Sequence, residues 1–132
     1  MFLLDTNILS DLIRHPQGAI AERIAEVGED AVATSIIVAG ELRYGARRRG
    51  SPRLSAQLEA VLELLSVLPL GDDADEHYGR LRADLERRGV PIGGNDMLIA
   101  AHALNLGATL VTDNVREFER VDGLDIVNWL RS

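Results

Sequence analysis

The sequence predicts an α/β fold with a central, mostly parallel sheet. Short apolar runs that suit buried strands alternate with longer segments in which apolar residues recur every three or four positions, as in helices. Strands that alternate with helices form βαβ units, and the helices then cover both faces of a parallel sheet. With 132 residues, the chain is expected to form one domain over residues 1–132.

Five runs fit strands, and the first begins almost at the N-terminus. Its residues, Phe-Leu-Leu, are apolar on both faces, which is typical of a strand in the middle of a parallel sheet. The predicted strands are Phe2–Leu4, Ala31–Thr34, Val67–Leu70, Thr109–Thr112 and Asp125–Trp129.

Six helices are predicted between these strands. Glycines that follow the apolar periodicity mark helix ends, and Pro52 suits the first turn of the fourth helix. The last helix is apolar almost all round, so we expect it to be buried, with His102 packed in the core. The predicted helices are residues 7–14, 16–27, 36–49, 52–65, 73–88 and 96–106.

The composition excludes several classes of protein. No apolar stretch approaches the roughly 20 residues of a membrane helix. The apolar start lacks the basic leader of a signal peptide, and the absence of cysteine excludes disulfides and thiolate chemistry. A cytoplasmic protein is therefore expected.

The charge balance is acidic, with 14 basic and 21 acidic residues and a net charge of −7. This argues mildly against a nucleic-acid partner, because phosphate binding usually leaves a basic footprint. All 14 basic residues are arginines, whose planar side chain suits phosphate, although a bias in codon usage explains the missing lysine equally well.

Two predicted strands end in the same way, on an aspartate followed by polar residues. The first strand ends at Asp5, Thr6 and Asn7, and the fourth ends at Asp113 and Asn114. In parallel sheets, ligands bind beyond the carboxyl ends of the strands. Each aspartate by itself is equally well explained as part of a helix cap or turn. The repeated pattern favours a site that contains both.

Glu41 lies on the apolar face of the predicted helix 36–49. A carboxylate on such a face loses hydration unless it is paired or bound to a cation. The alternative to a functional role is an ion pair with Arg43, Arg47 or Arg48, which are close in sequence.

Asp96 follows two glycines and opens the buried sixth helix, where it also suits helix capping. If Asp96 joins Asp5, Glu41 and Asp113, four carboxylates converge in a chain without lysine, and they repel one another strongly. Hard divalent cations with oxygen ligands resolve that repulsion, Mg²⁺ in particular. Because such ions activate water for phosphodiester hydrolysis, the residues predict a Mg²⁺- or Mn²⁺-dependent phosphodiesterase.

Four motifs in this order resemble those of PIN-domain proteins, and most closely those of VapC toxin ribonucleases from bacterial toxin–antitoxin pairs. They read DTNIL, SxxxxGELRYG, GGNDMLIAAHAL and LVTDN…REFERVDGLDIVNW, and they span nearly the whole chain. The resemblance implies a three-layer α/β/α sandwich, an endoribonuclease that cuts structured RNA such as tRNA or rRNA, and a homodimer. It also implies a VapB-type antitoxin that blocks the site and carries the toxin to operator DNA.

The same resemblance implies roles for individual residues. The acidic quartet of the family, which holds the metal, maps onto Asp5, Glu41, Asp96 and Asp113. Its polar supporting positions map onto Thr6, Asn7, Thr112 and Asn114. RNA would be bound by Arg43, Arg47 and Arg48, although these also suit a solvated helix end. Tyr44 would stack on a base or, in the favoured alternative, pack in the core or at a dimer contact.

Two other functions fit part of the pattern. A haloacid-dehalogenase-like phosphatase would use Asp5 as its nucleophile, but it needs a second aspartate where Asn7 stands, and it needs a lysine. A non-catalytic PIN-fold interaction module would not need the acidic quartet, which is intact here.

Overall fold

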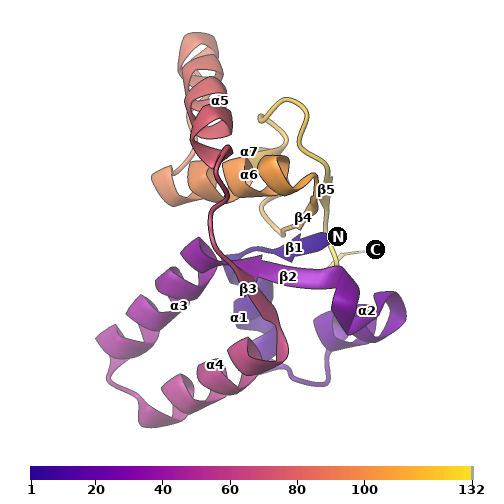
Figure 1. The fold of residues 1–132 in the computed structure, drawn as a ribbon. Coiled ribbons are helices and arrows are strands. Elements are labelled where there is room, and N and C mark those ends of the chain that lie inside the picture. The colour runs from indigo at the N-terminus through magenta and orange to yellow at the C-terminus, as the bar shows by residue number, and fades with distance from the viewer. Residues whose placement is uncertain (132) are drawn as a thin grey trace.

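Five strands form one sheet in the order β3-β2-β1-β4-β5, and every pairing is parallel (Figure 1). The structure is a computed structural model that describes residues 1–131. The strands are β1 (Phe2–Leu4), β2 (Val32–Ser35), β3 (Ser66–Leu68), β4 (Thr109–Val111) and β5 (Ile126–Val127). The predicted α/β class and parallel sheet are confirmed, with strand ends shifted by at most two residues.

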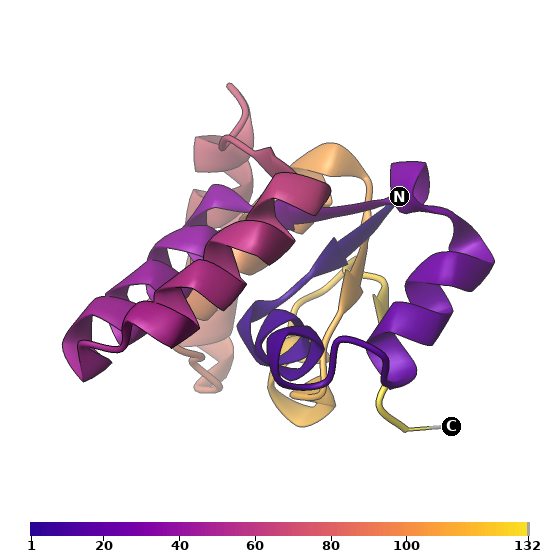
Figure 2. The same ribbon diagram turned by 90° about the horizontal axis from the view of Figure 1, so that it is seen from below.

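Helices cover both faces of this sheet, which gives the three layers that were expected. In Figure 1, α5 and α6 lie on one side of the sheet, and α1 and α2 lie on the other. The α3–α4 pair extends to one side of them (Figure 2). The helices are α1 (Thr6–Arg14), α2 (Ala19–Val27), α3 (Ile36–Arg49), α4 (Pro52–Leu64), α5 (Ala74–Arg88), α6 (Gly94–Leu106) and the short α7 (Val115–Phe118), with a 3₁₀ turn at Glu29–Ala31.

The helices differ from prediction in two boundaries by more than one residue and in one additional helix. The second helix begins at Ala19 rather than at Pro16, because residues 16–18 form a turn in which the Gly18 N–H donates to the His15 carbonyl. The sixth begins at Gly94, two residues before Asp96. The helix α7 was not predicted, since one turn is too short to show apolar periodicity.

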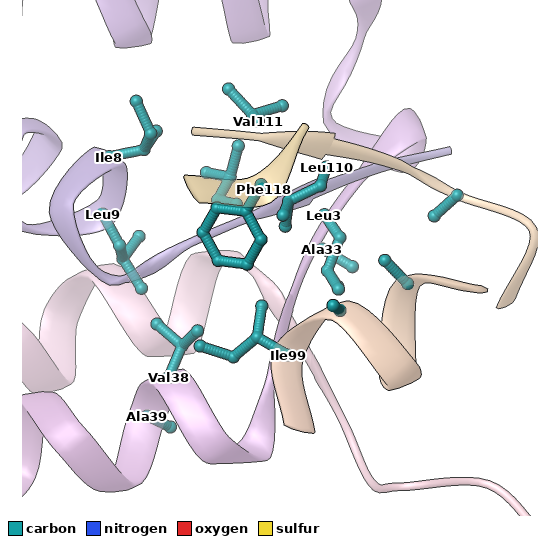
Figure 3. Close-up of a cluster of buried hydrophobic side chains, with 14 of the residues drawn as sticks. Leu3, Ile8, Leu9, Ala33, Val38, Ala39, Ile99, Leu110, Val111 and Phe118 are labelled. Carbon is teal, nitrogen blue, oxygen red and sulfur yellow. The ribbon is translucent and has the colours of Figure 1, made fainter. Parts of the chain in front are cut away.

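The apolar faces of the helices meet the sheet in one continuous core. Figure 3 shows Leu3, Ala33 and Leu110, from three adjacent strands, close to Ile99 of α6 and Phe118 of α7. All five side chains are at most 2% exposed. The small helix α7 is therefore held in place by a fully buried phenylalanine.

His102 is buried in α6, as predicted, and it has a structural role there. Its Nδ1 lies 2.8 Å from Ser35 Oγ, and the same oxygen accepts a hydrogen bond from the N–H of Ile37 at 3.1 Å. Burial lowers the pKa of His102, so that the ring stays neutral in the core. The pair fixes the start of α3 against α6.

The strand order places the carboxyl ends of β1 and β4 side by side. The chain runs from β1 outward to β2 and β3, and then returns to β4 on the other side of β1. The crevice at such a change of direction is where ligands bind in open α/β sheets. The register pairs Leu4 with Val111, so Asp5 and Thr112 leave the sheet next to each other.

None of the helices in residues 1–131 is both long and apolar enough to span a membrane.

Two leucines of α4 provide a matched test of this packing. Leu58 is 2% exposed and Leu64 is 74% exposed. Leu58→Ala leaves a cavity in the core and is expected to lower the free energy of unfolding by about 2–5 kcal/mol. Leu64→Ala removes the same atoms from the surface and is expected to change it by about 0.5 kcal/mol or less. Urea denaturation measures both, and equal effects would contradict the packing described.

Candidate functional site

Asp5 leaves the end of β1 and is held in place by hydrogen bonds on its side chain and main chain. Its N–H donates to the Val111 carbonyl at 3.0 Å, and its Oδ1 accepts from the N–H of Ile8 at 3.0 Å, which caps α1. The capping interpretation is therefore correct for Asp5. Capping alone does not explain its burial, however, because a helix cap can lie at the surface and Asp5 is only 4% exposed.

The surroundings of Asp5 oppose its negative charge. Burial raises the pKa of the carboxyl, and the nearby charge of Asp113 raises it further. Hydrogen bonds from the Thr112 side chain and from the N–H groups of Ile8 and Asn7 lower it, and the pKa stays raised overall. Asn7 therefore contributes its backbone N–H, whereas Thr112 contributes its side chain.

Glu41 enters the same region from α3 and is held by two neutral donors. The Thr6 hydroxyl donates to its Oε1 at 2.5 Å, and the Asn95 amide donates to its Oε2 at 3.1 Å. The alternative of an arginine pair is not what the structure shows, because Arg43 instead makes a bidentate ion pair with Glu59 of α4. Glu41 is therefore held at the carboxyl ends of the strands by Thr6 and Asn95.

Asp96 lies in the first turn of α6, which brings it against a carboxylate that was not predicted. Burial raises its pKa from the usual 3.8 to about 7, and the charges of Glu117, Glu41 and Asp5 and a hydrogen bond with Glu117 act in the same direction. Four carboxylates thus share one electrostatic environment. Like charges that are this close favour binding of a proton or a cation.

Glu117 is the site residue that sequence reasoning missed. It lies on α7, where its Oε1 accepts from the N–H of Gly93 at 2.9 Å and its Oε2 accepts from the Asn114 amide. A β-carbon at Gly93 would lie 3.4 Å from Asp96 Oδ2 and 3.9 Å from Glu117 Oε1, so this turn passes directly beside both carboxylates. The only sequence feature that could have pointed to Glu117 is the helical turn after Asn114. That helix is a single turn, which is too short to show apolar periodicity.

Asp113 lies at the edge of the site and has partners of its own. Its Oδ1 accepts from the Asn128 amide at 2.8 Å and from Arg131 Nε at 3.2 Å. The neighbouring Thr112 is fully buried, and its hydroxyl accepts from the N–H of Asn114 at 2.9 Å. Asp113 thus influences Asp5 by its charge, while its side chain is engaged by the C-terminal segment.

The carboxylates lie close together, but their oxygen atoms do not yet have the arrangement of a metal-binding site. Within residues 1–131, no three Asp, Glu or His side chains are arranged so that they could already hold a metal ion. Hydrogen bonds from Thr6, Asn95 and Gly93 hold Glu41 and Glu117 in their present positions. A cation would therefore have to draw the carboxylates together.

The residues expected to bind RNA lie along α3 rather than among the carboxylates. Arg43 forms an ion pair with Glu59, whereas Arg47 and Arg48 are exposed in the last turn of the helix. Tyr44 is 64% exposed, so it does not pack in the core, whereas a dimer contact stays a prediction.

Comparisons with known proteins agree with this arrangement. The model of the PIN domain family matches residues 2–124. The chain is 38% identical to the tRNA(fMet)-specific endonuclease VapC of Shigella flexneri and 36% identical to ribonuclease VapC2 of Rickettsia felis, and the matches cover 97–98% of each protein.

Solved structures give the same result. The crystal structure of VapBC2 from Rickettsia felis bound to a promoter DNA fragment contains a chain with a TM-score of 0.90 and 34% identity, covering 97% of this chain and 98% of that one. VapBC-1 of nontypeable Haemophilus influenzae contains one with a TM-score of 0.87 and 36% identity, covering 98% of both chains. The chain therefore belongs to the PIN domain family, among its VapC members.

Proposed function

We propose that this protein is a Mg²⁺-dependent endoribonuclease, the toxin of a VapBC-type toxin–antitoxin pair. The observation that carries the proposal is the group of carboxylates around Asp96, whose pKa is raised to about 7. A protein gains no stability from burying like charges together, so such a group indicates a functional site. The full-length similarity to VapC ribonucleases gives the chemistry that the site would perform.

The donor atoms suit a hard divalent cation. Four side chains supply carboxylate oxygens: Asp5, Glu41, Asp96 and Glu117. Oxygen atoms are the ligands that hard divalent cations such as Mg²⁺ and Mn²⁺ prefer. Asp5 and Asp96 are the main candidate ligands, because burial and like charge make their ionised forms the most in need of a counter-charge. We assign Asp113 a weaker role, as a charge near Asp5.

A bound divalent cation would lower the pKa of a water molecule and neutralise charge on the phosphodiester. The protein holds the carboxylates that would bind this cation in fixed positions. Asp5 is fixed by the backbone of α1 and β4, and Glu41 is fixed by Thr6 and Asn95. A hydrogen bond between Asp96 and Glu117 holds these two carboxyl groups side by side.

The relatives indicate the substrate and the partner. Two of them, from Shigella flexneri and Salmonella typhimurium, are named tRNA(fMet)-specific endonucleases, so initiator tRNA is the substrate to test first. Several of the similar structures are VapBC complexes, two of them on DNA. A VapB-type antitoxin, assembly on operator DNA and a homodimer are therefore part of the proposal, as is action in the cytoplasm.

Removal of the central carboxylates tests the catalytic assignment. Asp5→Asn or Asp96→Asn is expected to lower cleavage of an initiator tRNA transcript at least about 100-fold, since even outer-shell metal partners are worth 10–100-fold. EDTA should abolish cleavage, and Mg²⁺ or Mn²⁺ should restore it. Asp30→Asn, the same change at an exposed position before β2, should have no effect. Hydrolysis of a small phosphomonoester instead of RNA would favour the phosphatase.

The raised pKa of Asp96 predicts how stability depends on pH. Its carboxyl binds a proton more tightly in the folded state, so its stabilising effect is complete below 3.8 and is lost as pH rises through about 7. In EDTA, the free energy of unfolding should therefore fall over this range, and less steeply in Asp96→Asn. Urea denaturation at a series of pH values measures it, and parallel curves for the two proteins would contradict the shift.

Glu117 and Asp113 can be compared directly. Glu117→Gln removes a charge beside Asp96, and we expect it to weaken Mn²⁺ binding more than Asp113→Asn, whose side chain is engaged by Asn128 and Arg131. Isothermal titration calorimetry with Mn²⁺ measures both affinities. A larger loss of Mn²⁺ affinity from Asp113→Asn would instead support Asp113 as a metal ligand, the role expected from the sequence.

A further inference from the structure

A cavity of about 570 Å³ opens beside the carboxylates, along the exposed side of α3. Its lining includes Thr6 and Asn95, the two donors to Glu41, together with Ile36, Gly40 and Tyr44. The volume lies in the range of about 300–1,000 Å³ that is usual for small-ligand sites. The cavity therefore extends from Glu41, which also lines it, to one face of this helix.

That face carries a stripe of residues spaced four apart, which we call the α3 stripe: Ile36, Gly40, Tyr44 and Arg48. Residues at this spacing lie above one another on a helix. Ile36 is 48% exposed and Tyr44 is 64% exposed, although both are large and apolar. A β-carbon on Gly40 would meet nothing within 4 Å, so the helix backbone is open to a ligand between these two side chains.

The far end of the α3 stripe is basic. Arg47, Arg48 and Arg49 form the last turn of α3. The ion pairs among residues 1–131 include none of these three, whereas Arg43, on another side of the helix, is paired with Glu59. An aromatic platform followed by free arginines is the arrangement with which proteins bind single-stranded nucleic acid.

We propose that the α3 stripe is a nucleotide subsite, in which a base next to the cleaved phosphodiester stacks on Tyr44 and the following phosphate contacts Arg48. The proposal rests on the proposed ribonuclease function. Arg48 lies one helical turn, about 6 Å along the axis, beyond Tyr44. The open space over Gly40 leaves room for the ribose between Tyr44 and Glu41. Tyr44 is thus a substrate-positioning residue that does not touch the reacting water.

Kinetics with an initiator tRNA transcript test the role of Tyr44. Tyr44→Ala is expected to raise KM by roughly 5- to 150-fold, the effect of losing one stacked base, and to leave kcat unchanged. Tyr44→Phe keeps the aromatic face and should keep the wild-type KM. Tyr78→Ala, which removes the other tyrosine of the chain from α5, is the matched control and should keep it too.

Arg48 is tested through ionic strength. Arg48→Ala is expected to lower the slope of log KM against log salt by about 1, because one phosphate contact is lost. Arg23→Ala, at an exposed position of α2 that pairs with Glu26, should leave the slope unchanged.

Photocrosslinking separates this subsite from the catalytic proposal. In Asp5→Asn protein, tRNA substituted with 5-iodouridine should crosslink to the peptide that contains Tyr44, as mapped by mass spectrometry. A wild-type protein that crosslinks there without cleaving RNA would overturn the ribonuclease but not the subsite. An unchanged KM in active Tyr44→Ala overturns the subsite. So does a Tyr44→Ala protein whose only defect is a changed oligomeric mass or weaker antitoxin binding.

Discussion

The parallel pairing of β1 with β4 is the constraint on which the site depends. It places Asp5 and Thr112 next to each other at the carboxyl ends of the strands, where the Asp5 N–H donates to the Val111 carbonyl. On the other side of β1, the hydroxyl of Thr34 donates to the Leu4 carbonyl at 2.8 Å. A shift of one residue in either pairing would turn Asp5 to the opposite face of the sheet.

The other carboxylates reach this edge on helices, and each helix is fixed by buried contacts. The start of α3 is held by Ser35 and His102, and α7 is held by Phe118 in the core. Rigid supports are needed because the carboxylates repel one another, and a flexible group would relax by moving apart. The core therefore supplies the energy that keeps an unfavourable arrangement of charges in place.

This arrangement also reconciles an acidic chain with an RNA substrate. The net charge of −7 includes the carboxylates of the site, whose charge a divalent cation would offset in part. The basic turn at the end of α3 lies apart from these carboxylates, and the exposed Tyr44 lies on the same helix between Glu41 and that turn. Local charge along the path of the substrate, rather than the sum over the chain, is what a bound RNA experiences.

The amino-acid sequence by itself determined the α/β class, the five strands, six of the helices, and the candidacy of Asp5, Glu41 and Asp96, because periodicity and strand ends are local signals. Only the tertiary structure decided that Glu117 stands against Asp96, that Asp113 is engaged by Asn128 and Arg131, and that Tyr44 is exposed. Each of these depends on where segments far apart in sequence meet. A single helical turn or an exposed aromatic carries no local pattern that reports it.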